Sequence, residues 1–139
     1  MNAGVSPSLI EKLGLRNGHR AGWVGLPADL GALPLSRTLR RSDLVLRGRD
    51  LSPGPFDYIH IFSVSRAVLA DDLAEARARL APDGMIWVSW PKRAARWPTD
   101  ITEDGIRALA LEGPLVDVKV CAVNDVWSAL KLVIRKGQR

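Results

Sequence analysis

The chain has little of what disulfides, metal centres and membrane spans require. Cys121 is its only cysteine, so no internal disulfide can form, and a lone thiol is typical of a reducing compartment. The two histidines, His19 and His60, lie far apart and far from Cys121, without the paired spacing of zinc ligands. No apolar run approaches the roughly 18 residues that cross a bilayer, and the first residues lack the basic and apolar regions of a signal peptide. We therefore expect a cytoplasmic protein with no metal and no membrane contact.

Hydrophobic residues are plentiful, at 47% of 139 residues, which is enough to build the core of one domain. We expect residues 1–139 to form that domain, with residues 1–5 and 136–139 frayed. The net charge of +5 and the pI of about 10 permit nucleic acid as a partner. The arginines are spread among apolar and acidic neighbours, however, and this pattern favours a solvated basic surface.

Residues 56–92 organise the rest of the chain. Phe56–Phe62 is a β-prone apolar run that indicates a buried strand. Ser65 is placed to cap a helix whose apolar positions continue to Leu80, and Pro82-Asp83-Gly84 predicts its end. Residues 85–90 then form a second strand. Strand, helix and strand at this length predict a right-handed crossover between parallel strands.

The segments before this unit are shorter. Ser6-Pro7 predicts the start of a helix that Gly14 ends, and residues 21–25 form a strand. Residues 27–33 have room for one helical turn at most. Either residues 37–41 or residues 44–46 supply an edge strand whose arginines discourage pairing with another molecule.

The segments after it alternate between helix and strand. A helix begins at Thr99 or Asp100, with Glu103 in the position of a capping box, and ends at residues 113–114. Residues 116–123 and 130–135 predict an antiparallel hairpin. Lys119 and Lys131 would then face each other, and such like charges cost stability unless an acidic side chain or a ligand phosphate lies between them.

This order of elements resembles the class I, S-adenosylmethionine-dependent methyltransferase fold. Phe56–Ile59 is similar to that family's fourth strand, and Leu80–Ile86 to its L-x-P-G-G-x-L/I entry into strand five. The likeness covers residues 56–135. It implies an α/β fold, an open three-layer, Rossmann-like, mostly parallel sheet with a C-terminal antiparallel hairpin, in shortened form.

The first half departs from that family. Its glycine-rich turn after strand one would correspond to residues 25–31, where Gly25 and Asp29 are the weak candidates for cofactor contact and Pro27 interrupts the turn. Its acidic residue after strand two has only Asp43 as a counterpart. Too few residues separate Gly31 from Phe56 for two βα units, so we expect one unit to be missing. S-adenosylmethionine is therefore a possible cofactor that these residues disfavour.

A smaller bacterial domain family of truncated methyltransferase-like proteins also resembles the chain. The resemblance rests on three runs: S-W-P-K at 89–92, T-D-x-T-E-D at 99–104, and D-V-K-V-C-A-V…W-S-x-L-K at 117–131. It implies no reaction.

A ligand site is expected at the carboxyl ends of the parallel strands. The candidate ligand-binding residues at this edge are Ser89, Trp90, Lys92, Asn124, Trp127, Ser128 and Lys131. Indoles, an ammonium group and a nearby helix start suit a planar or anionic ligand. Alternatively, Trp90 and Trp127 plug the end of the sheet and Lys92 is solvated. Cys121 and His60 are more typical of a buried hydrophobe and a hydrogen-bonded core histidine than of catalysts.

Three functions remain open from the sequence. The first is a non-catalytic methyltransferase-like domain that binds a small molecule or a protein partner. The second is an S-adenosylmethionine-dependent methyltransferase with a degenerate cofactor loop, and the third is a basic nucleic-acid-binding accessory protein. The sequence is compatible with a monomer or a homodimer.

Overall fold

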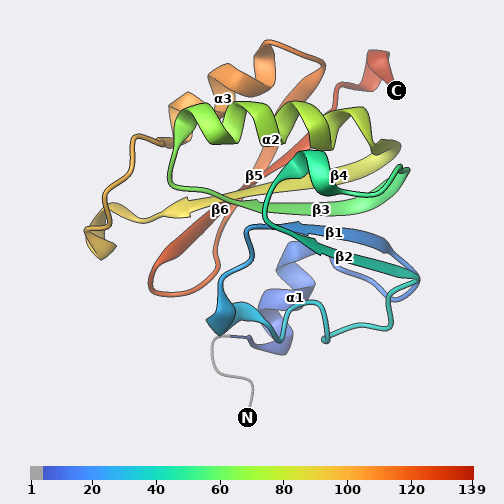
Figure 1. The fold of residues 1–139 in the computed structure, drawn as a ribbon, viewed down its shortest axis with the longest axis horizontal. Helices are drawn as coiled ribbons and strands as arrows, with labels where there is room; N and C mark the ends of the chain where they lie inside the picture. The colour runs from blue at the N-terminus through green and yellow to red at the C-terminus, as the bar shows by residue number, and fades with distance from the viewer. Residues whose placement is uncertain (1–4) are drawn as a thin grey trace.

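A six-stranded sheet forms the middle layer of the computed structural model, which describes residues 5–139 (Figure 1). Its strand order is β2-β1-β3-β4-β6-β5. The strands are β1 (Arg20–Val24), β2 (Arg41–Val45), β3 (Phe56–Phe62), β4 (Leu80–Pro91), β5 (Leu115–Ala122) and β6 (Trp127–Ile134). The first four are parallel, and β6 runs antiparallel to both β4 and β5. The predicted fold class, including the closing hairpin, is confirmed.

Helices cover both faces of this sheet. Figure 1 shows α1 (Pro7–Leu13) on one side and α2 (Arg66–Ala78) with α3 (Glu103–Leu111) on the other. Among residues 5–139, three 3-10 turns lie between these elements, η1 (Ala28–Leu30), η2 (Gly48–Asp50) and η3 (Arg93–Ala95), and a fourth, η4 (Lys136–Gln138), follows β6. The predicted fraying concerned residues 1–5 and 136–139. Residues 1–4 lie outside the described part, Val5 is buried, and residues 136–138 form η4. Within residues 5–139, no helix has the length and apolarity of a membrane span.

Local sequence signals account for α1. The Ser6 hydroxyl accepts a hydrogen bond from the Leu9 amide at 3.1 Å, and Pro7 occupies the first turn. Gly14 ends the helix with φ 70°, a left-handed conformation that favours glycine. The predicted start and end of this helix are confirmed.

The central β3-α2-β4 unit has the predicted parallel strands, but its helix is shorter than expected. α2 ends at Ala78, and β4 begins at Leu80 instead of Met85. The reason is strand pairing: Leu80 lies opposite Phe56, whose amide donates to the Arg79 carbonyl at 2.8 Å. A register shift between Phe56 and Tyr58 takes up the extra residues around Gly84. Pairing with β3 therefore outweighs the helical spacing of Leu80.

The predicted start of α3 is also wrong by a few residues. The helix begins at Glu103, after Thr102, whose hydroxyl accepts from the Gly105 amide at 3.0 Å. Asp100 instead accepts a hydrogen bond from the Arg66 amide at 2.7 Å, at the first turn of α2. A tertiary contact thus takes the carboxylate that the sequence pattern assigned to a local cap.

The stretch between β1 and β3 contains one short edge strand, β2, and no α-helix. This strand spans residues of both predicted ranges, and its edge carries Arg41. The next turn, η2, packs directly on α2, because a Cβ at Gly48 would lie 2.8 Å from the Asp72 carbonyl oxygen. The fold is therefore shortened at this point, as the residue count predicted.

Candidate functional site

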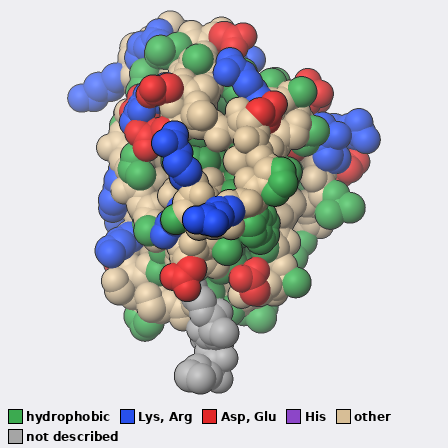
Figure 2. Space-filling view, turned by 90° about the vertical axis from the view of Figure 1, so that its left-hand side faces the viewer, with side chains coloured by type: hydrophobic (Ala, Val, Ile, Leu, Met, Phe, Trp, Pro, Cys, Tyr) green, Lys and Arg blue, Asp and Glu red, His purple; other side chains and the backbone are tan. Residues whose placement is uncertain are grey.

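A pocket of about 440 Å³ lies at the carboxyl end of β4, beside the first turn of α3. Its lining combines aromatic, cationic and hydroxyl side chains: Trp90, Pro91, Lys92, Arg93, Trp97, Thr99, Ile101, Thr102 and Glu103. We call it the strand-end pocket. Figure 2 looks onto this end of the sheet, where hydrophobic side chains gather near the middle and Lys and Arg side chains lie beside them.

Backbone contacts position the loop that forms one wall. The Lys92 amide donates to the Val126 carbonyl at 2.6 Å, which ties the end of β4 to the β5–β6 turn. After η3, Arg96 takes a left-handed conformation with φ 57°, which changes the chain direction. The Thr99 hydroxyl then donates to the Val64 carbonyl at 2.7 Å and fastens the loop beside α2.

Aromatic packing holds Trp97 at this wall. Its ring meets that of Trp127 edge to face, with centroids 5.5 Å apart at 79°, and Trp127 meets Phe62 at 5.4 Å and 90°. Trp127 is buried, whereas 46% of Trp97 is exposed. Trp97 therefore offers ring surface to a ligand, and Trp127 supports it from behind.

The charges of the pocket are positive and uncompensated. Neither Lys92 nor Arg93 makes an ion pair with any carboxylate of the described chain. Glu103, the one acidic lining residue, pairs with Arg107. The pocket can therefore take an anionic group next to an aromatic surface.

Of the seven predicted ligand-binding residues, Trp90 and Lys92 line this pocket. Trp127 lies behind Trp97, and Ser128 is the strand partner of Trp90. The Asn124 side-chain oxygen accepts from the amides of Val126 and Trp127 at 2.9 Å each, so it shapes the hairpin turn. Ser89 is buried within the sheet, as described next. Lys131 lies four residues into β6, opposite Trp87, away from the strand ends.

A fully buried polar chain runs through the strands behind the site. Tyr58 Oη is 2.9 Å from His60 Nδ1, and His60 Nε2 is 2.7 Å from Ser89 Oγ. Burial lowers the pKa of His60 from 6.5 to about 3, so the imidazole is neutral. The predicted hydrogen-bonded core histidine is confirmed. Cys121 is buried as well, and burial raises the pKa of its thiol, which disfavours the nucleophilic thiolate.

The seven predicted residues leave out much of the pocket lining, namely Pro91, Arg93, Trp97, Thr99, Ile101, Thr102 and Glu103. A tryptophan within a basic loop was the available signal. This signal places Trp97 in the pocket only together with the contact between Trp97 and Trp127, which joins segments 30 residues apart in the chain.

The residues after β1 do not fit the adenosine-binding role that the methyltransferase likeness implies. A Cβ at Gly25, where φ is 68°, would lie 2.8 Å from the Phe62 carbonyl oxygen, so this glycine serves the close approach of two strand ends. Leu30 of η1 is fully buried, and Asp29 is exposed on the same turn. Asp43 accepts hydrogen bonds from the Ser52 amide and hydroxyl, at 2.9 and 2.5 Å. Asp43 and Gly25 therefore serve contacts within the fold.

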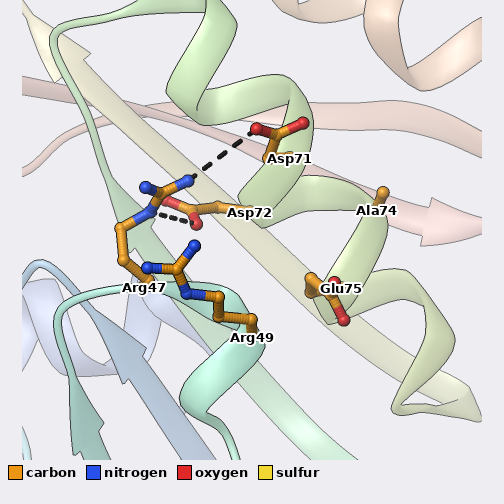
Figure 3. Close-up of a pocket in the computed structure, with 6 residues that line it drawn as sticks. All are labelled: Arg47, Arg49, Asp71, Asp72, Ala74 and Glu75. Atoms are coloured by element: carbon orange, nitrogen blue, oxygen red, sulfur yellow. Dashed lines mark hydrogen bonds and ion pairs between the residues drawn. The ribbon is translucent and has the colours of Figure 1, made fainter.

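A second, smaller cavity of about 210 Å³ lies where η2 meets α2 (Figure 3). Arg47 reaches Asp72 at 3.0 Å and Asp71 at 3.9 Å, and Asp72 also accepts from the Gly48 amide at 2.9 Å. The Asp72 side chain is 3% exposed. These contacts bind the loop to the helix, and we assign them a structural role.

Comparison with solved structures identifies the fold. A magnesium protoporphyrin IX methyltransferase from Synechocystis with bound SAM matches 93% of this chain and 77% of its own, with a TM-score of 0.67 and 11% identity. A 1,6-didemethyltoxoflavin N1-methyltransferase from Burkholderia thailandensis matches 97% and 80%, at 0.68 and 16%. An N-methyltransferase from Bradyrhizobium japonicum matches 93% and 94%, at 0.62 and 15%.

The amino-acid sequence alone matches no family profile and no curated protein. The likeness therefore lies in the fold, and it agrees with the strand order and the closing hairpin described above. The chain has a shortened, six-stranded form of the class I methyltransferase fold.

Proposed function

We propose that this protein is a non-catalytic methyltransferase-like domain that binds a planar, anionic small molecule in the strand-end pocket. The observation that carries the proposal is the half-exposed ring of Trp97 beside Lys92 and Arg93, two cations without a carboxylate partner in residues 5–139. An aromatic surface next to unpaired positive charge recognises a flat ligand that carries a carboxylate or a phosphate.

The hydroxyl and carboxyl groups of the pocket support binding over catalysis. The Thr99 hydroxyl donates to Val64, and the Thr102 hydroxyl accepts from Gly105. Glu103 is held by Arg107. A general base or nucleophile needs a free lone pair and a neighbour that activates it. The activating base is missing from this lining, because Glu103 is its one carboxylate and is paired with Arg107.

A protein partner could use the same pocket. It would insert a side-chain or C-terminal carboxylate next to an aromatic side chain, and these groups would contact Lys92 and Trp97 as the small molecule does. We favour the small molecule because the pocket volume of about 440 Å³ lies within the range of ligand sites, roughly 300–1,000 Å³.

Titration with 2-naphthoate, followed by tryptophan fluorescence, tests the proposal. Its uncharged counterpart, 2-naphthamide, isolates the contribution of the charge. We expect saturable binding of naphthoate, weakened on the order of tenfold by Lys92→Gln and by Trp97→Ala. Lys136→Gln is the control, because it removes an exposed charge in η4, outside the pocket. Equal affinity for the two probes, or naphthoate binding that both pocket variants leave unchanged, would refute the proposal.

A further inference from the structure

The closing hairpin places two lysines directly against each other. Lys119 of β5 is the register partner of Lys131 of β6, as the sequence pattern predicted. Residues directly opposite in an antiparallel pair have Cβ atoms about 4.5–5.5 Å apart, and like charges there are destabilising. A negatively charged group between the two lysines would relieve this repulsion.

The chain's own nearby carboxylate is directed away from these lysines. β5 has a register shift between Asp117 and Lys119, so that Asp117 lies opposite Leu132 and Lys119 opposite Lys131. Neighbouring residues of β6 point to opposite faces of the sheet, and their partners do the same. Asp117 consequently lies on the α3 face, where it pairs with Arg107 at 2.9 Å. In a regular strand, Asp117 and Lys119 would share one face, so this bulge separates the acid from the lysine pair.

The end of α1 adds two further cations. Lys119 Nζ donates to the Lys12 carbonyl at 3.3 Å, which brings the C-terminal turn of α1 against the hairpin. Burial, together with the charges of Lys119 and Arg16, lowers the pKa of Lys131. The charges of Lys12 and Lys119 act together on the nearby Cys121. Trp87, the β4 partner of Lys131, also donates from Nε1 to the Leu13 carbonyl at 2.8 Å. The end of α1, with Lys12 in its last turn and Arg16 just after it, therefore lies beside the two lysines of the hairpin.

The carboxylates of α1 and β5 are engaged elsewhere. Within residues 5–139, none of Lys12, Arg16, Lys119 and Lys131 forms an ion pair. Glu11, the acidic residue of α1, binds Arg37 at 3.2 Å. Arg107, on the opposite face, pairs with Glu103, Asp104 and Asp117. The hairpin thus has its acidic partners on one face and its unpaired cations on the other.

We propose that Lys12, Arg16, Lys119 and Lys131, here called the hairpin cation cluster, bind the oxygens of a phosphate group. Lysine ammonium groups bind phosphate as mobile point charges, and an arginine adds a planar pair of donors. The phosphate compensates the repulsion between Lys119 and Lys131 that the bulge leaves in place. This cluster is separate from the strand-end pocket, since Lys131 lies four residues into β6 and none of the four lines that pocket.

Calorimetric titration with inorganic pyrophosphate at fixed ionic strength tests this site. We expect saturable binding that Lys119→Gln and Lys131→Met each weaken on the order of tenfold. Without ligand, Lys131→Met should melt at the same temperature as the natural protein or higher, because it removes a repulsive charge. Lys136→Gln, which removes an equal charge outside the cluster, should bind pyrophosphate as the natural protein does.

A single-stranded 5′-phosphorylated oligonucleotide distinguishes the two sources of such a phosphate. If the source is a nucleic-acid backbone, the oligonucleotide binds more tightly than pyrophosphate, with affinity that falls steeply with salt. If the source is a free phosphate compound, pyrophosphate binds at least as tightly. Both results support the cluster when the two lysine variants weaken the binding. Absent binding of both probes, or binding that neither variant changes, overturns the proposal.

Discussion

Trp97 and Trp127, whose rings meet at the end of the sheet, have different roles. Trp127 is buried between Phe62 and Trp97, whereas Trp97 is half-exposed and faces the strand-end pocket. The sequence left open whether Trp90 and Trp127 plug the sheet or bind a ligand. In the structure, Trp127 packs in the core, whereas Trp90 and Trp97 line the pocket.

Truncation of each indole should separate these roles. We expect Trp127→Ala to lower the free energy of unfolding by about 3–5 kcal/mol, since it leaves a cavity in the core. Trp97→Ala should cost about 1 kcal/mol, because its ring is half in solvent. Chemical denaturation of both variants provides the measurement. Equal losses would contradict the distinction.

The buried imidazole of His60 predicts how stability depends on pH. Its pKa is about 3 in the folded chain and 6.5 when unperturbed, so between these values the unfolded chain binds a proton that the native state does not. Stability is therefore complete above pH 6.5 and falls as the pH drops below it, by up to about 1.4 kcal/mol per unit.

Denaturant unfolding at pH 7 and pH 5 measures this contribution. We expect the natural protein to lose more stability between the two than His60→Gln does, because glutamine takes up no proton. The comparison cancels the contribution of His19, whose pKa burial also lowers. Identical losses in the two proteins would show that His60 does not carry the effect.

At the scale of elements, the contact between η2 and α2 takes the place of a longer connection. The nearly buried Asp72 accepts from Arg47 and from the Gly48 amide, whereas Asp71 is exposed and lies 3.9 Å from Arg47. Asp71 and Asp72, adjacent in α2, therefore differ in how strongly they hold η2 against this helix.

Asp72→Ala should lower the free energy of unfolding by about 1–3 kcal/mol, because it leaves the buried Gly48 amide without an acceptor. Asp71→Ala is the matched control, and it should change stability by less than about 1 kcal/mol. Thermal or urea unfolding checks both. A large effect at Asp71 or none at Asp72 would contradict the structural role of this contact.

The elements also show where sequence patterns suffice. Ser6 and Gly14 set both ends of α1 through local hydrogen bonds, so their residue types were enough to predict it. The end of α2 depends on the pairing of Leu80 with Phe56, and the start of α3 on the use of Asp100 by α2. Those boundaries are set by contacts between distant segments, which periodicity does not contain.

At the scale of the whole molecule, the missing unit was predictable and the pocket was not. Counting residues between Gly31 and Phe56 was enough to exclude two βα units, because each needs a minimum length. The pocket arises from a loop that folds back on the β5–β6 turn through Lys92 and Trp97. The bulge at Asp117 likewise became visible only through the strand register.

Our central proposal is that this shortened fold does not bind adenosine as the class I scaffold does. Titration with S-adenosylmethionine and with S-adenosylhomocysteine, followed by the melting temperature, tests it most directly. A ligand that binds the native state at a concentration 100 times its dissociation constant adds about 2.7 kcal/mol to the free energy of unfolding. We predict no shift with either compound at millimolar concentration. A saturable rise in melting temperature with either one would contradict the account.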